Sequence, residues 1–126
     1  MMKRLLILVL SLLMLVLCIP ALAESTDWNY DANYAILRGY DGAGGDVVVP
    51  AEIDGFTVDV IGISVFKGDT ITSLTLPETV LELRSNAVSS CENLASVTLP
   101  QSLVVINRMN FFSCNALSEI TIPAGV

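Results

Sequence analysis

The chain has 126 residues, with 13 acidic and six basic side chains, no histidine and a formal net charge of −7. Without histidine the sequence lacks the commonest general base and the commonest zinc ligand, and its negative charge repels phosphate backbones and anionic head groups. We therefore expect no nucleic-acid or membrane partner, and the length allows one small domain.

Residues 1–23 have the three parts of a secretory signal peptide. MMKR is a positive start, an apolar run follows from Leu5 to Ile19, and the small-residue site Ala21-Leu22-Ala23 precedes Glu24. The run is shorter than the roughly 20 residues that a membrane-spanning helix needs. We expect cleavage after Ala23 and export to the medium or the cell surface. Cleavage removes two basic residues and leaves four basic and 13 acidic ones, so the net charge becomes 4 − 13 = −9.

Residues 24–49 differ in pattern from the rest of the chain. The stretch DWNYDANYAILRGYD, which starts at Asp27, alternates aromatic or branched apolar residues with polar ones around a turn at Asp31-Ala32-Asn33. This pattern predicts a β-hairpin, which is followed by a glycine-rich turn and a short strand that ends at Pro50. Because the first coil of a repeat array needs a cover, we expect the hairpin to cap the residues that follow.

The repeats are predicted to span residues 50–126, and from Ile71 to Val126 a short phrase returns at a fixed interval. SLTLPETV, SVTLPQSL and EITIPAGV place Pro77, Pro100 and Pro123 23 residues apart each time. A fixed period of this size is typical of a solenoid, in which no repeat can bury its apolar face alone. Pro50 lies 27 residues before Pro77, and an insertion of five residues near Asp54-Gly55 with a deletion of one accounts for the difference.

Within each repeat the pattern predicts a strand, a turn, a second extended piece and one brief helical turn. Alternation in Leu74-Thr75-Leu76 puts the leucines in the core and the threonine outside, and Pro77 ends the strand because it has no N–H to donate. Helical or 3-10 turns are expected at 63–66, 85–89 and 108–112. The predicted fold class is an α/β repeat solenoid of about three coils, with short parallel strands and an N-terminal hairpin cap.

The last coil is incomplete in this sequence, because Val126 stands only three residues after Pro123. The strand predicted at 118–122 would therefore have an unpaired edge, which is a site for self-association. Two interpretations stay open. Either the chain is a fragment of a longer array, or a partner or a second copy covers this edge.

Cys91 and Cys114 are one period apart and should occupy the same place on neighbouring coils. The spacing between stacked strands lies within the range that a disulfide tolerates, but equivalent side chains on stacked coils point in the same direction. A ladder of two buried thiols and a disulfide both remain possible. No metal site is expected, since the sequence has neither histidine nor a CxxC pair.

The repeats resemble the BspA-like leucine-rich repeat family of bacterial and protozoan surface proteins, whose unit reads LxxLxLPxxLxxIGxxAFxxC. Here it occurs as ITSLTLPETVLELRSNAVSSC, which ends at Cys91, and as LASVTLPQSLVVINRMNFFSC, which ends at Cys114. The resemblance implies a non-catalytic module on the cell surface or in the medium that binds a protein, such as a host matrix or cell-surface protein. The alternative is a truncated structural fragment of a longer repeat protein with no independent activity.

The outward positions of the repeat strands are the candidate protein-binding face. They carry polar residues in rows one coil apart, although threonine also suits a plain solvated strand surface and no aromatic or arginine anchor stands among them. No catalytic residue and no cofactor is expected, because the carboxylates are scattered. The candidate residues are Ser73, Thr75, Ser96, Thr98, Glu119 and Thr121.

Overall fold

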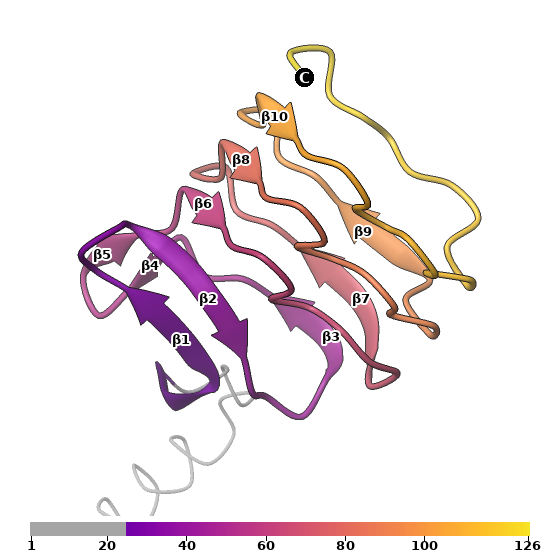
Figure 1. Cartoon of the computed structure of the whole chain (residues 1–126), viewed down its shortest axis with the longest axis horizontal. Coiled ribbons are helices and arrows are strands. Elements are labelled where there is room, and N and C mark those ends of the chain that lie inside the picture. The colour runs from indigo at the N-terminus through magenta and orange to yellow at the C-terminus, as the bar shows by residue number, and fades with distance from the viewer. Residues whose placement is uncertain (1–24) are drawn as a thin grey trace, which may run out of the picture.

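A computed structural model describes residues 25–126, so the predicted signal peptide, residues 1–23, lies outside the described residues. The described chain begins with a short 3-10 helix, η1 (Ser25–Asp27), and then winds into a solenoid. Each coil contributes one strand to each of two sheets, which lie on opposite sides of a shared apolar core (Figure 1).

One sheet has three parallel strands in the order β3-β7-β9. They are β3 (Gly45–Val48), β7 (Ile71–Thr75) and β9 (Ser96–Thr98). Its inward residues Val47 and Leu74 are 3 % and 1 % exposed and occupy the same rung as Val97. The sheet forms because the repeat places an apolar residue at the same strand position in every coil, and stacking buries these positions together.

The other sheet has five strands in the order β1-β2-β6-β8-β10. Strands β1 and β2 form an antiparallel hairpin, and the remaining pairs are parallel. The inward rung of this sheet runs through Leu37, Ile61 and Leu83, which are fully buried, and ends at Ile106, which is partly buried. The bounds are β1 (Trp28–Asp31), β2 (Ile36–Tyr40), β6 (Val60–Ile61), β8 (Glu82–Leu83) and β10 (Val105–Ile106).

The insertion before the first full repeat forms a small antiparallel hairpin of β4 (Glu52–Ile53) and β5 (Phe56–Thr57). Its two turn residues, Asp54 and Gly55, have φ angles of 51° and 83°. Two successive positive φ angles are what a two-residue type I′ turn requires, and Asp-Gly is a favoured pair there. The insertion is thus a local hairpin that is held to the rest of the molecule by Ile53, which is buried in the core, and by Tyr30, whose hydroxyl donates to the Thr57 carbonyl at 2.8 Å.

An aromatic cluster closes the N-terminal end of the core. The Trp28 ring lies 4.8 Å from the Tyr40 ring and 6.4 Å from the Phe66 ring, and the last two are 5.8 Å apart. Trp28 is 7 % exposed and Phe66 is fully buried. The hairpin of β1 and β2 thus covers the apolar face that the first coil would otherwise expose.

The predicted helical turns are not confirmed. Within residues 25–126 the only helix is η1, and the segments 63–66, 85–89 and 108–112 are turns. Ser64, Asn86 and Met109, which occupy equivalent positions, have φ angles of 55°, 57° and 61°, in the left-handed region that interrupts a right-handed helix. The fold is therefore a parallel β-solenoid, and no helix in the described part of the chain is long and apolar enough to span a bilayer.

Hydrogen bonds between coils explain why turns replace helices. The Phe66 N–H donates to the Ala87 carbonyl at 2.9 Å, and the Ser89 N–H donates to the Phe66 carbonyl at 3.1 Å. These bonds pair Phe66 with Val88 in a parallel bridge. Buried backbone groups must be paired, and the neighbouring coil offers partners that a single helical turn does not.

The predicted strand at 118–122 is also absent. Within the described residues no backbone hydrogen bond joins this segment to β9, and in Figure 1 it runs apart from that strand. Leu117 and Ile120 still pack against the core, while Ile122 is 48 % exposed. The segment 118–122 thus keeps part of the apolar contacts of a repeat, whereas the hydrogen-bonded strands of this sheet end with β9.

Candidate functional site

The outward residues of β3, β7 and β9 form two parallel rows. Asp46, Ser73 and Ser96 share one rung, and Val48, Thr75 and Thr98 share another. We call these six residues the strand face. Side chains alternate across a strand, so the burial of the intervening rung, Val47, Leu74 and Val97, turns all six outward.

The strand face is polar, with one apolar corner. The Ser73 hydroxyl donates a 2.7 Å hydrogen bond to Asp46 Oδ1, which links β7 to β3 at the surface. Val48 is 63 % exposed at the end of its row. The four basic residues within 25–126 all lie outside the face, so Asp46 alone gives it a negative charge. Such a surface suits contact with neutral or basic groups.

The structure places four of the six predicted site residues together. Ser73 and Thr75 are half-buried on β7, and Ser96 and Thr98 are exposed on β9. The other two, Glu119 and Thr121, are exposed in the segment 118–122, which is not part of the sheet. The rows therefore run from β3 to β9 and do not continue into this last segment.

Asp46 and Val48 belong to the face but were not among the predicted residues. The signal that points to them is the proline register, because Asp46 precedes Pro50 by the same four residues by which Ser73 precedes Pro77. The prediction that residues 24–49 form the cap leaves β3 out of the repeat pattern. The pairing of Val48 with Thr75 instead makes β3 the first strand of the repeat sheet.

The arrangement of the strand face offers contact surface. In residues 25–126 no cluster of three histidine, cysteine, aspartate or glutamate side chains is placed to hold a metal ion. Cys91 and Cys114 are free thiols inside the core. Burial, and then the neighbouring Cys114, raise the pKa of the Cys91 thiol to about 11, so it is neutral at physiological pH.

Comparisons with known proteins agree with this fold. The family model described as "BspA type Leucine rich repeat region (6 copies)" matches residues 52–126. A crystal structure of a leucine-rich repeat protein from T. pallidum superposes with a TM-score of 0.72 at 28 % identity over 83 % of this chain. The chain spans only 50 % of the length of that protein.

A leucine-rich repeat protein from Bacteroides capillosus ATCC 29799 is also similar. Its crystal structure superposes with a TM-score of 0.68 at 34 % identity, over 79 % of this chain and 78 % of the other. No curated protein gives a significant match.

Proposed function

The chain belongs to the BspA-type leucine-rich repeat family, and from this premise we propose that it is a secreted or cell-surface module that binds a protein ligand through the strand face. The observation that carries the proposal is the pair of outward rows, in which equivalent residues of three strands stand side by side. Stacked repeats characteristically use such extended, regular surfaces for binding.

The chemistry of the strand face favours recognition by hydrogen bonds. Its hydroxyl groups donate and accept, Asp46 accepts, and Val48 adds an apolar contact at one end. A host matrix protein or another cell-surface protein that presents neutral or basic side chains fits this surface. Export through the predicted signal peptide would bring the module to such a ligand.

The substitution Thr98→Arg tests the proposal. It puts a long cation on an exposed position of β9, where it blocks the hydroxyl row and adds an unpaired charge at the interface. We expect binding of the purified chain to immobilised extracellular-matrix extract to fall at least tenfold. The far-ultraviolet circular dichroism should stay unchanged, because Thr98 points to solvent.

Thr57→Arg is the matched control. Thr57 is also exposed but lies on β5, in the small hairpin outside the repeat sheet. We expect this variant to bind like the unmodified chain. An equal loss of binding in both variants, or no loss in Thr98→Arg, would contradict a ligand site on the strand face.

The competing proposal is a structural piece of a longer repeat protein with no activity of its own. It is motivated by the T. pallidum relative, of which this chain spans 50 %. Light scattering separates the two proposals. A single species with a cooperative thermal transition supports the binding module, whereas aggregation that starts at the segment 118–126 supports the structural piece.

A further inference from the structure

The five-stranded sheet presents a second outward surface, on the opposite side of the core from the strand face. In the register of this sheet Leu37, Ile61 and Leu83 share a buried rung. The next residues along the three strands are Arg38, Gly62 and Arg84, and we call them the arginine row. Backbone bonds extend the ladder to this row, from Gly62 N–H to Leu37 O at 2.8 Å and from Arg84 N–H to Ile61 O at 3.0 Å.

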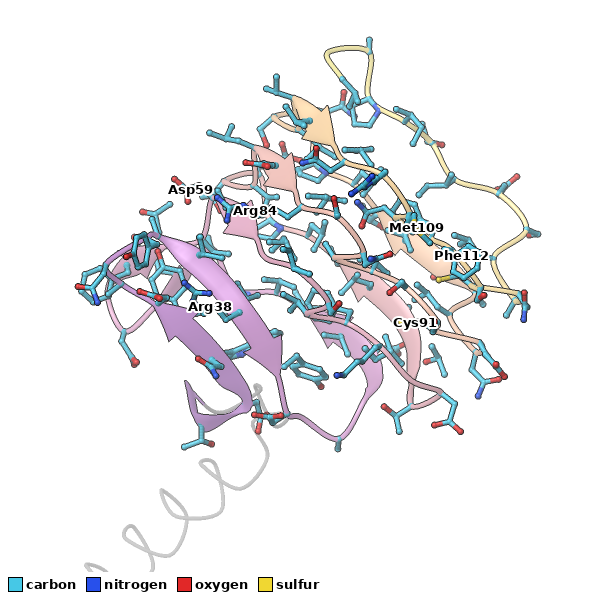
Figure 2. The ribbon with its side chains drawn as sticks, viewed as in Figure 1. Arg38, Asp59, Arg84, Cys91, Met109 and Phe112 are labelled. Atoms are coloured by element: carbon cyan, nitrogen blue, oxygen red, sulfur yellow. The ribbon has the colours of Figure 1, made fainter. Side chains whose placement is uncertain are left out.

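Gly62 leaves a gap in the middle of the row. A shallow depression of about 100 Å³ opens there, and its walls are Ile36, Ile63 and the two arginines (Figure 2 labels both arginines). A Cβ atom at position 62 would lie 2.7 Å from the Leu37 carbonyl oxygen and 2.9 Å from Ile36 Cγ2, so close packing requires glycine. The depression thus combines two guanidinium groups with an exposed isoleucine.

The arginine row contains a large share of the basic residues of the described chain. Residues 25–126 contain four basic and 12 acidic side chains, which gives 4 − 12 = −8. Two of the four basic residues belong to the arginine row. Because Leu83 pairs with Ile106, the next residue after Ile106, Asn107, lies beside Arg84 and continues the row. A third basic residue, Arg108, directly follows Asn107. Asp31 and Glu82 stand beside the two arginines and balance their charge, whereas the other described residues carry 2 − 10 = −8, so an acidic ligand is repelled less here than elsewhere.

The first arginine is held in place and keeps free donors. Arg38 Nε donates to Asp31 Oδ2 at 2.7 Å, and its guanidinium carbon lies 5.7 Å from the centre of the Tyr34 ring. A guanidinium group has five N–H donors, so four remain on Arg38 after this bond. Asp31 and Tyr34 fix the orientation of the group, which lowers the entropy cost of a further contact.

The second arginine is less engaged. Arg84 Nε lies 3.8 Å from Glu82 Oε1, which is beyond hydrogen-bond distance. Glu82 Oε1 instead accepts a 3.0 Å bond from Asn107 Nδ2. Among residues 25–126 no side chain accepts a hydrogen bond from the Arg84 guanidinium, and the Arg84 side chain is 42 % exposed, so a ligand can reach it.

We propose that the arginine row binds a side-chain carboxylate of an acidic peptide segment in a protein ligand. Arg38 and Arg84 lie on the two strands that flank Gly62, about 10 Å apart at their backbones, and both line the depression. Arg84 supplies the free guanidinium fork, while Arg38 stays bonded to Asp31 and offers its remaining donors. The planar guanidinium fork matches a carboxylate with two parallel hydrogen bonds. Ile63, which is 63 % exposed, covers the methylene groups of the ligand side chain.

Nuclear magnetic resonance of the isotopically labelled chain tests this site with a tetraglutamate peptide that is blocked at both ends. We expect saturable shifts of the Gly62 amide and of the Arg84 Nε–H signal. Arg84→Gln should weaken binding at least tenfold. The affinity of Arg84→Lys should lie between that of the unmodified chain and that of Arg84→Gln, because lysine keeps the charge but lacks the planar guanidinium group.

Lys67→Gln is the charge-matched control, since Lys67 is exposed and lies outside the arginine row. This variant should bind tetraglutamate within twofold of the unmodified chain. Equal weakening by Lys67→Gln and Arg84→Gln would overturn the site in favour of non-specific charge attraction. So would equal binding of a blocked tetraglutamine peptide, or the absence of saturable shifts. None of these outcomes depends on the strand face, because Thr98 lies on the other sheet.

Discussion

The middle coil, with β7 and β8, and the last coil that contains strands, with β9 and β10, have nearly the same repeat pattern but different local structures. In the middle coil Val88 pairs with Phe66 of the first coil through backbone bonds on both sides. In the last coil the Phe111 N–H donates to the Val88 carbonyl at 2.6 Å, but the Val88 N–H finds a side chain, Asn110 Oδ1, at 3.1 Å. The residues of the repeat therefore do not by themselves ensure that a coil pairs with its neighbour through backbone hydrogen bonds.

The backbone of the last coil is less regular than that of the middle coil. Phe111 has a left-handed φ angle of 64°, whereas its counterpart Val88 does not, and the left-handed position that Asn86 occupies in the middle coil is occupied here by Met109, with a φ angle of 61°. Phe112 is 56 % exposed and Met109 is 50 % exposed. By contrast the first coil has its apolar face covered by Trp28 and the hairpin. Coverage on both sides of a coil is what makes the repeat geometry regular.

The largest expected effect on stability comes from a substitution at the N-terminal end, where the hairpin covers the core. Phe66→Ala removes a fully buried ring from the aromatic cluster and leaves a cavity, which should lower the free energy of unfolding by about 3–5 kcal/mol. Phe112→Ala, at the exposed end, should change it by less than about 0.5 kcal/mol. Urea denaturation followed by circular dichroism measures both values. Similar losses would show that the two ends are equally packed.

An intermediate effect is expected where a side chain replaces the backbone ladder. Asn110 accepts from Val88 N–H, and its Nδ2 donates to the Arg84 and Asn107 carbonyls at 2.9 Å each. Asn110→Ala restores the residue type of Ala87, its counterpart in the middle coil. It nevertheless should lower the unfolding free energy by about 1–3 kcal/mol, because these partly buried groups lose their partners.

Asn93→Ala is the control for Asn110→Ala in the same denaturation experiment. Asn93 makes one exposed hydrogen bond, from Nδ2 to the Asp69 carbonyl at 2.8 Å, and water replaces it readily. We expect its loss to cost less than about 0.5 kcal/mol. An Asn110→Ala variant as stable as Asn93→Ala would contradict the role of Asn110 in joining the last coil to the middle one.

The smallest expected effect is a gain in stability. Met109→Gly relieves a left-handed conformation that a side chain disfavours, and we expect an increase in unfolding free energy of about 0.5–1 kcal/mol, since the added freedom of the unfolded glycine offsets part of the relief. Asn86→Gly, at the equivalent position, should be nearly neutral because asparagine tolerates this conformation. Differential scanning calorimetry of the pair decides the question. A destabilised Met109→Gly would show that the methionine side chain contributes packing there.

Local pattern was sufficient for part of this structure. The spacing of Pro77 and Pro100 predicts which residues of successive coils stand in register, and the alternation around Leu74 predicts which of them face outward. Both follow from the geometry of a strand and from burial of one side of it. Four of the six predicted face residues lie where this reasoning puts them, and the same register points to Asp46 and Val48.

Tertiary structure decided what depends on a neighbouring coil. The segment 63–66 becomes a turn because Phe66 bonds to the next coil, and 118–122 stays outside the ladder although its sequence resembles β7 and β9. The arginine row exists only because β2 of the hairpin pairs with β6. The 23-residue period does not predict this pairing, because β2 is not part of a repeat. Hydrogen bonds and contacts between segments distant in the sequence select among local conformations that differ little in energy. The sequence of a single repeat does not determine these contacts.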